Sequence, residues 1–299
     1  MNHLIGGKEM NDQRKNFRER LRGKGIIVAP GAYDALSARI IEKAGFPAVY
    51  LTGGGLSRSW GFPDIGLMTM TENVSFIARV CDSVDIPVIA DADTGYGNAL
   101  NVIRTVREYE RAGVAAFHLE DQVTPKRCGH YEGKDVVSKE EMIAKIKAAV
   151  DARKDTDLAI IARTDSRAVL GLDEAIQRGN AYAGAGADIV FVEAPQGLEE
   201  LRRITEEIRA PILVNMIRGS RTPLLPAKDL EKMGFKVAIY PNEAHRAALW
   251  AVQACVRHLK EKGTTEGFEG MIDFAAREEI VGTARWDALG KRYVSLAEK

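Results

Sequence analysis

The chain has 299 residues, of which 42 are lysine or arginine and 42 are aspartate or glutamate, so its formal net charge is zero. This balance argues against nucleic-acid binding and against a polybasic membrane anchor. No apolar run approaches the roughly 20 residues that a membrane-spanning helix needs, and the polar N-terminal segment lacks the apolar core of a secretory signal. We therefore expect a globular protein with a sizeable core and no nucleic-acid or membrane partner.

The three cysteines, Cys81, Cys128 and Cys255, are odd in number and widely spaced. Such a pattern argues against a disulfide framework and favours a reducing, cytoplasmic location. No pair of cysteines or histidines has the spacing of zinc ligands. Cys81 and Cys255 fall in predicted helices and are interpreted as packing residues, which leaves Cys128 available for chemistry.

Along the chain, residues 1–11 are predicted to be a disordered tail and residues 12–23 a charged helix. A regular alternation of apolar runs and amphipathic stretches follows. Continuous apolar runs, rather than alternating ones, are typical of parallel strands buried on both faces. Eight such runs are predicted as strands, at residues 26–29, 48–51, 87–90, 115–119, 158–162, 188–192, 211–214 and 236–240.

The intervening stretches have helical periodicity. Ser138 and Glu141 have the spacing of a capping box at the start of one helix. Several helices end in an Ala-Gly pair, where glycine supplies a left-handed cap. The predicted helices between strands include residues 34–45, 98–113, 138–153, 173–186 and 197–209, with a long helix at 242–262 and further helical pieces over 265–295.

Eight strand–helix units predict an α/β fold, a (β/α)8 TIM barrel. An open doubly wound sheet is disfavoured by the count of eight and by the lack of a G-x-G-x-x-G fingerprint after the first strand. We expect the barrel to span residues 12–262. Residues 263–299 are expected to form a C-terminal helical extension that packs on a neighbouring subunit.

Polar residues follow most of the predicted strands. Because the C-terminal ends of barrel strands form the active-site face, these residues are expected to converge at one mouth. Helix capping explains one or two such acids, but not so many strand ends. The residues are Thr52-Gly53-Gly54-Gly55, Asp91 and Asp93, Glu120-Asp121, Arg163-Thr164-Asp165, Glu193 and Asn215.

Asp91 and Asp93 alternate at a strand end, so their side chains point to opposite sides unless the backbone turns. Gly95, Tyr96 and Gly97 follow at once and make a turn the expectation. Clustered carboxylates without His or Cys ligands favour Mg²⁺, or Mn²⁺, over Zn²⁺. The glycines after Thr52 allow close approach of backbone amides to an anion, and an arginine such as Arg163 suits a carboxylate.

The stretch Lys126-Arg127-Cys128-Gly129-His130 gathers cations, a thiol and an imidazole. These neighbours are expected to lower the thiol pKa or to make its proton mobile, so Cys128 is predicted to be a nucleophile or a general acid. A mouth lined by carboxylates suits proton transfer to a carbanion, which favours the acid. His118, inside the fourth strand, either lines the barrel or is a hydrogen-bonded core histidine.

Several blocks together resemble the isocitrate lyase / phosphoenolpyruvate mutase superfamily, on its lyase branch. The resemblance covers roughly residues 24–260, and the blocks occur in the family's order. They are residues 50–55 (YLTGGG), 63–66 (PDIG), 91–97 (DADTGYG), 119–122 (LEDQ), 126–130 (KRCGH), 162–165 (ARTD) and 191–194 (FVEA). Thr52 departs from the serine of many lyases but keeps the hydroxyl.

The resemblance implies a (β/α)8 barrel whose eighth helix is exchanged between subunits of a homotetramer, with Mg²⁺ as cofactor. It implies that Asp91 and Asp93 hold the metal, directly or through water, with Asp64 and Glu120 in the outer sphere. It implies substrate binding by Thr52, Gly53, Gly54, Lys126, Arg127, Gly129, Arg163, Glu193 and Asn215. Catalytic roles fall to Cys128 as general acid and to Glu120, Arg163, His130 and Tyr50.

The implied reaction is retro-aldol cleavage of a di- or tricarboxylate to a 2-oxo acid and an enediolate. The length fits 2-methylisocitrate lyases, and the stretches 215–217 and 222–224 also resemble dimethylmalate-type members. An oxaloacetate hydrolase is an alternative, disfavoured by Pro241 where such enzymes need a small hydroxyl. A barrel that only binds ligands is a further alternative, disfavoured because no acid, arginine or cysteine of the set is missing. The phosphonate enzymes of this superfamily lack the cysteine motif, which argues against that branch for this chain.

Overall fold

The structure is a computed structural model that describes residues 10–127, 129 and 133–297. The chain forms two compact units, Met1–Ala244 and His245–Lys299. The first holds the strands and the second is helical.

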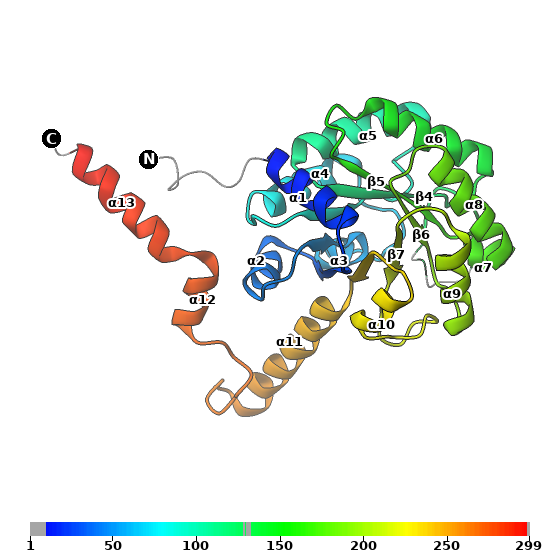
Figure 1. Cartoon of the computed structure of the whole chain (residues 1–299). Coiled ribbons are helices and arrows are strands. Elements are labelled where there is room, and N and C mark those ends of the chain that lie inside the picture. The colour runs from blue at the N-terminus through cyan, green and yellow to red at the C-terminus, as the bar shows by residue number, and fades with distance from the viewer. Residues whose placement is uncertain (1–9, 128, 130–132, 298–299) are drawn as a thin grey trace. The chain divides into compact units, whose positions relative to one another are not determined.

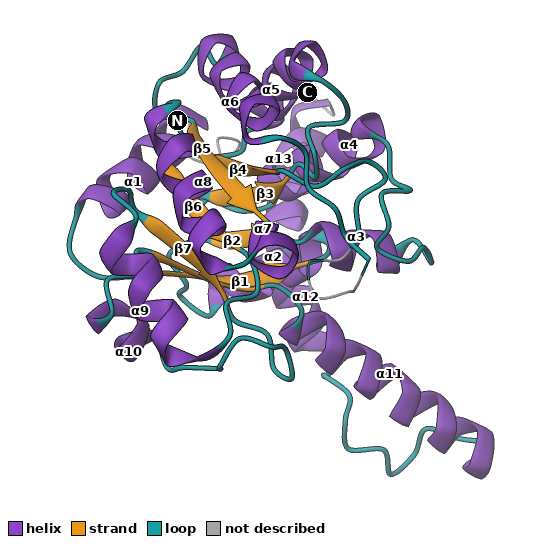
Figure 2. Cartoon of the chain, turned by 90° about the vertical axis from the view of Figure 1, so that its right-hand side faces the viewer, coloured by secondary structure: helices purple, strands orange, loops and turns teal. Residues whose placement is uncertain are grey.

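In the first unit, the described strands form a closed parallel barrel in the order β1-β2-β3-β4-β5-β6-β7-β8. Parallel pairing of β1 with β8, through partners such as Ile27 and Val237, closes the ring. Figures 1 and 2 show helices surrounding the strands. The predicted TIM barrel is therefore confirmed, with strands β1 (Ile27–Ala32), β2 (Val49–Leu51), β3 (Val88–Asp91), β4 (Ala116–Glu120), β5 (Ala159–Thr164), β6 (Ile189–Val192), β7 (Ile212–Asn215) and β8 (Val237–Tyr240).

The helices predicted between strands are also present, with ends within about three residues of those expected. They are α2 (Ala35–Lys43), α5 (Ala99–Ala112), α6 (Lys139–Ala152), α8 (Leu172–Gly184) and α9 (Gly197–Glu207). The helix containing Cys81 is α4 (Met70–Cys81). Short helices that the sequence analysis did not predict are α3 (Gly53–Ser59), α7 (Ser166–Leu170) and α10 (Ala227–Lys232).

Local capping explains several of these ends. Gly113 ends α5 in the left-handed conformation, as the Ala-Gly pattern predicted. Ser138 caps α6 by accepting a hydrogen bond from the Glu141 N–H at 3.1 Å. The Glu141 carboxylate instead faces Lys145, 3.5 Å away. Of the two hydrogen bonds of the predicted capping box, the one accepted by the serine side chain is therefore present.

The helix α1 (Met10–Arg22) packs against the N-terminal part of the barrel interior. Its Phe17 and Leu21 belong to the same buried cluster as strand residues such as Ile27 and Val237. Its Arg18 binds Asp188 at 2.7 Å and donates to carbonyls of residues 156–158. Because α1 covers this end, the C-terminal ends of the strands are the face available for a site.

The second unit contains most of α11 (Glu243–Lys262), together with α12 (Phe274–Val281) and α13 (Thr283–Ala297). Large apolar side chains on these helices are exposed, including Trp250, Phe274 and Trp286. The packing of this extension on a neighbouring subunit stays a prediction. Within residues 10–127 and 133–297, no helix combines the length and apolarity needed to cross a membrane.

Gly31 marks a tight point where β1 meets the chain after β8. A Cβ atom there would lie 2.6 Å from backbone atoms of Pro241, which cannot rotate away. We expect Gly31→Ala to lower the free energy of unfolding by about 1–3 kcal/mol, seen as a lower midpoint in urea. Gly184→Ala, at the end of α8 with open space around it, is the control and should match or exceed the wild type. Equal midpoints for Gly31→Ala and wild type would contradict this packing argument.

Candidate active site

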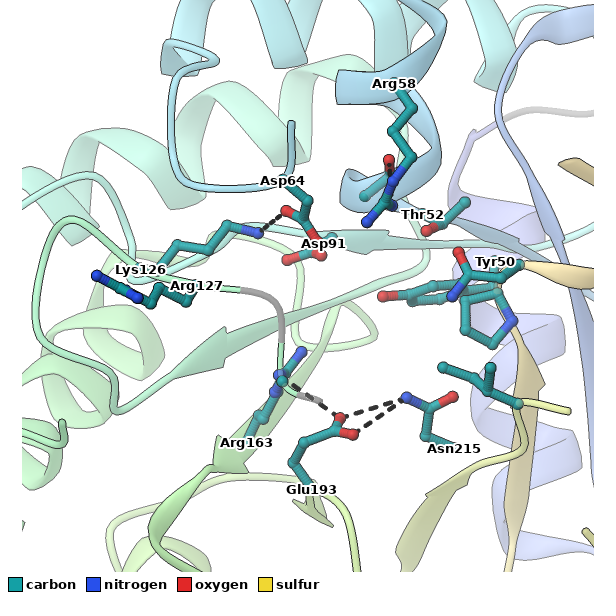
Figure 3. A pocket seen from close by; sticks show the side chains of 15 residues that line it. Tyr50, Thr52, Arg58, Asp64, Asp91, Lys126, Arg127, Arg163, Glu193 and Asn215 are labelled. Atoms are coloured by element: carbon teal, nitrogen blue, oxygen red, sulfur yellow. Dashed lines mark hydrogen bonds and ion pairs between the residues drawn. The ribbon is translucent and has the colours of Figure 1, made fainter. Parts of the chain in front are cut away.

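A pocket at the C-terminal ends of the strands gathers most of the predicted site residues (Figure 3). Gly53, Asp93 and Glu120 are not among its lining residues, although Asp93 and Glu120 are buried. Cys128 and His130 lie outside the residues that the structure describes. The lining consists of Tyr50, Thr52, Gly54, Arg58, Asp64, Asp91, Lys126, Arg127, Gly129, Arg163, Glu193, Asn215, Ile217, Pro241 and Asn242.

Asp91 and Asp93 occupy the turn that the sequence predicted after the third strand. Asp93 has a positive φ of 46°, and its N–H donates to Asp91 Oδ1 at 2.9 Å. The turn overcomes the strand's alternation and brings the carboxylates together. Burial raises the pKa of both carboxyl groups above its ordinary value, although Lys126 acts in the opposite direction.

Lys126 supplies positive charge to these acids. Its Nζ contacts Asp64 Oδ1 and lies 2.8 Å from Asp93 Oδ1, and its side chain is 7% exposed. Burial alone would lower the pKa of Lys126, but Asp93 and Asp64 raise it well above its ordinary value. The predicted substrate-binding lysine therefore sits against the acids that were assigned to the metal.

The acidic cluster offers oxygen atoms that suit a hard cation. Glu120 Oε1 is buried and accepts no hydrogen bond from any described residue. Asp93 Oδ1 is also buried, and the Lys126 ammonium lies 2.8 Å from it. In the described ranges, no group of three or more His, Cys, Asp or Glu side chains is arranged to hold a metal. Mg²⁺ needs only one or two protein carboxylates because it retains waters and binds substrate oxygens. The donor set therefore fits Mg²⁺ in its chemistry.

Arg163, at the end of β5, is surrounded by acids. Its guanidinium lies 3.1 Å from Glu120 Oε2 and 3.5 Å from Glu193 Oε2, and it donates to both oxygens of Asp165 at 2.9 and 3.1 Å. Burial alone would lower the pKa of Arg163, but Asp165 and Glu120 raise it well above its ordinary value. The guanidinium is therefore a fixed positive charge at the pocket wall.

Glu193 and Asn215 form a pair across the ends of β6 and β7. Asn215 Nδ2 lies 3.3 and 3.4 Å from the two carboxylate oxygens of Glu193, as Figure 3 shows. Asn215 Oδ1 is buried and accepts no hydrogen bond within the described residues. It is therefore an acceptor available to a substrate donor. The exposed Arg127 points away from the other labelled side chains (Figure 3).

The glycine-rich stretch begins helix α3 instead of forming a loop. Thr52 Oγ1 caps the helix by accepting the Gly55 N–H at 3.2 Å. A Cβ at Gly53 would lie 2.6 Å from Asp91 Oδ2, and one at Gly54 would lie 2.8 Å from Asp64 Oδ2. Glycine is needed here because the backbone packs directly on the carboxylates.

Tyr50 and His118 link the pocket to the barrel core. Tyr50 Oη and His118 Nε2 are 2.8 Å apart, with both side chains buried. Burial lowers the pKa of His118 to about 3 and is the largest cause that raises the pKa of Tyr50 well above its ordinary value. Both groups are therefore uncharged near neutral pH. His118 is therefore a hydrogen-bonded histidine of the barrel core, and its side chain also holds the pocket residue Tyr50.

Sequence reasoning missed the lining residues Arg58 and Asn242, and it missed Lys134, which lies behind the pocket wall. Arg58 lines the pocket and donates to the Gly54 carbonyl at 2.8 Å. Arg58 follows Gly54 by four residues, a spacing that brings the two together on a helix. This spacing could have indicated Arg58 only if the helix α3 had been predicted. Lys134 contacts Asp165, a contact between two distant loops that has no local signal in the sequence.

Comparison with known proteins gives consistent results. A family model described as phosphoenolpyruvate phosphomutase matches residues 17–260. The chain is 51% identical over 275 residues to a 2,3-dimethylmalate lyase of Eubacterium barkeri, covering 91% of this chain and 95% of the relative. It is 46% identical over 248 residues to a 2-methylisocitrate lyase of Aeropyrum pernix, covering 83% and 80%.

Solved structures agree with these relatives. A crystal structure of 2,3-dimethylmalate lyase, described as a PEP mutase/isocitrate lyase superfamily member, matches with a TM-score of 0.89 and 37% identity, covering 94% of this chain and 95% of that one. Oxaloacetate acetylhydrolase with 3,3-difluorooxalacetate matches with a TM-score of 0.89 and 34% identity, covering 95% and 97%. Phosphonopyruvate hydrolase with oxalate and Mg²⁺ matches with a TM-score of 0.87 and 31% identity, covering 94% and 99%.

The Lys126 ammonium and a divalent cation should compensate the same acids. We expect Lys126→Met to melt at a lower temperature than wild type in EDTA, because loss of one partner of a buried ion pair costs about 3–5 kcal/mol. Added Mg²⁺ should raise the melting temperature more in the variant than in wild type. Thermal melts in EDTA and in Mg²⁺ test this. The exposed Lys228→Met is the control, and an unchanged melt of Lys126→Met in EDTA would refute the expectation.

Proposed function

Because the chain belongs to the phosphoenolpyruvate mutase / isocitrate lyase superfamily, as its motifs predicted, we propose that it is a Mg²⁺-dependent lyase of substituted malates. The class includes 2,3-dimethylmalate and 2-methylisocitrate, which relatives at 51% and 46% identity are named for. These names bear out the predicted carbon–carbon lyase. The observation that carries the proposal is a single pocket that combines metal-suited carboxylates with the buried Arg163 cation.

We assign Mg²⁺ to Asp91 and Asp93, directly or through water, with Asp64 and Glu120 in the outer sphere. The buried Glu120 Oε1, which has no hydrogen-bond donor among the described residues, supports this assignment. The turn that brings the Asp91 and Asp93 carboxylates together also supports it. When bound, Mg²⁺ would polarise substrate oxygens and offset their negative charge. Manganese suits the same oxygen donors.

The 2-oxo acid portion is assigned to the backbone of Thr52, Gly53 and Gly54, together with Arg163. The close approach of Gly53 and Gly54 to the acids supports it, because it places these amides beside the expected metal. The second carboxylate is assigned to Asn215, Glu193 and residues 129–130. Arg163 and Asn215 offset the charge of Glu193 there.

Cleavage begins when the substrate 2-hydroxyl loses its proton. Its oxygen forms the carbonyl, the C2–C3 bond breaks, and the bonding electrons pass to C3 as an enediolate with the adjacent carboxylate. Arg163 is placed to stabilise developing negative charge without reorganising. Cys128 is assigned as the acid that protonates C3, on the resemblance of residues 126–130. A 2-methyl substrate then releases pyruvate and a second carboxylic acid.

Oxaloacetate hydrolysis is the second candidate, because oxaloacetate acetylhydrolase has a TM-score of 0.89 with this chain. Pro241 lines the pocket and supplies no hydroxyl, which disfavours the hydrolase. We further propose that the enzyme acts as a cytoplasmic homotetramer, in which residues 263–299 pack on a neighbouring subunit.

The proposed activity is tested with 2,3-dimethylmalate, 2-methylisocitrate and oxaloacetate. We expect at least one substituted malate to release a 2-oxo acid when Mg²⁺ is present, and a coupled dehydrogenase assay detects this product. In EDTA, the release should be lost. If no substituted malate is cleaved, or if EDTA has no effect, the proposal fails. Production of oxalate from oxaloacetate would instead establish the hydrolase.

The proposed role of Cys128 as the general acid can be tested separately by substitution. Cys128→Ser should lower kcat at least about 100-fold, the lower scale of acid–base catalysis, while the fold and Mg²⁺ binding persist. Circular dichroism and Mg²⁺ titration check those two properties. Cys255→Ser, at a half-buried free thiol, is the matched control and should retain activity. Near-normal turnover of Cys128→Ser would remove Cys128 from this role.

A further inference from the structure

Lys134 places a buried ammonium group behind the pocket wall. Its side chain is 2% exposed and that of Asp165 is fully buried. Lys134 Nζ donates to Asp165 Oδ1 at 2.8 Å and to the carbonyl oxygen of Gly129. Lys134 is not among the pocket-lining residues, whereas Gly129 is. A buried lysine loses hydration and rotamer freedom, so these two contacts must offset that cost.

The first contact leads to Arg163. Asp165 Oδ2 accepts from Arg163 Nε at 2.9 Å, and Asp165 Oδ1 accepts from Arg163 Nη2 at 3.1 Å. The Asp165 backbone is held separately, since its N–H donates to Asp121 Oδ1 at 2.9 Å. With the backbone fixed, the plane of the Asp165 carboxylate depends on Lys134 and Arg163. Oδ1, which Lys134 holds, is also the oxygen that receives Nη2.

The charges around Arg163 show why that plane matters. Its guanidinium also faces Glu120 at 3.1 Å and Glu193 at 3.5 Å, so acids draw it in different directions. Without Lys134, Asp165 would carry its full negative charge against Arg163 and pull the guanidinium toward itself. The Lys134 ammonium offsets part of the negative charge of Asp165 and so weakens the attraction between Asp165 and the Arg163 guanidinium.

The second contact leads to the same arginine by another route. A Cβ on Gly129 would clash with Arg163 Nη2 and lie 2.7 Å from Glu193 Cγ. The Gly129 backbone therefore rests directly on the Arg163–Glu193 pair. Lys134 holds the carbonyl of this residue, so one ammonium fixes both the partner of Arg163 and the backbone packed on it.

We propose that Lys134 is a positioning residue, which sets the orientation of Arg163 through Asp165 and holds Gly129 against Arg163 and Glu193. The catalytic consequence rests on the proposed lyase function, whereas the geometric consequence does not. If Lys134 served stability alone, its loss would weaken the fold but leave Arg163 in place and turnover per folded enzyme unchanged.

The test replaces Lys134 by methionine, which matches most of the aliphatic stem and removes the charged ammonium. The control is Lys147→Met on the exposed face of α6. Crystal structures of wild type and Lys134→Met should show the Arg163 guanidinium displaced by more than about 0.5 Å, the tolerance of a productive site. For folded enzyme, kcat should fall roughly 100-fold, the scale of a misplacement of about 1 Å. KM should rise as well, because Arg163 is also assigned to substrate binding, so kcat and kcat/KM of folded enzyme are compared together.

Removal of a buried ion-pair partner can prevent folding, so each variant is first checked by thermal melting. If Lys134→Met does not fold, Lys134→Gln, which removes the charge that offsets Asp165, is measured in the same way. An Arg163 position unchanged within about 0.5 Å overturns the proposal, as does a kcat equal to that of Lys147→Met. If wild type cleaves no substituted malate, the lyase proposal fails, while the position of Arg163 in the crystals still decides the role of Lys134.

Discussion

The barrel mouth depends on one constraint: a buried carboxylate must be matched by a nearby positive charge. Taking an ion out of water costs several kcal/mol unless a partner compensates it. The chain places Asp93, Glu120, Asp165 and Glu193 where each is at most 9% exposed. Lys126 and Lys134, both between β4 and α6, and Arg163 in β5 meet these acids. The positions of the cations therefore follow from the positions of the acids.

This constraint also gives the pocket its division into two parts. On one side, Lys126 faces Asp64 and Asp93, whose oxygens suit a hard divalent cation. On the other side, Arg163 is held by carboxylates that fix its charge and its direction. In the proposed function, a substrate with two carboxylates and a hydroxyl would lie between these two parts. The same arrangement keeps the charges preorganised, which is how such sites stabilise developing charge.

Sequence reasoning located the barrel and much of the site because both depend on local patterns. Apolar runs identify strands that are buried on both faces, and the polar residues that follow most of these runs must lie at the C-terminal rim. The turn at Asp93 followed from the glycines beside it. By contrast, α3 was missed because three glycines oppose helix formation in isolation, and packing on Asp91 and Asp64 overrides that preference. Contacts such as Lys126 with Asp64 or Lys134 with Asp165 join residues that are 62 and 31 positions apart, so no local pattern reports them.

The N-terminal helix shows what this architecture demands of the chain as it is made. Arg18 in α1 binds Asp188, 170 residues later, and β1 pairs with β8 to complete the ring. Contacts so distant in sequence make folding slow, because the intervening chain must be ordered first. During synthesis, α1 meets its partners in sequence, because Gln13 and Arg14 bind carbonyls of Val84, Glu110 and Val114 long before Asp188 is made. The helix α1 therefore joins the barrel in stages, and the Arg18 guanidinium gains its carboxylate partner only once Asp188 has been synthesised.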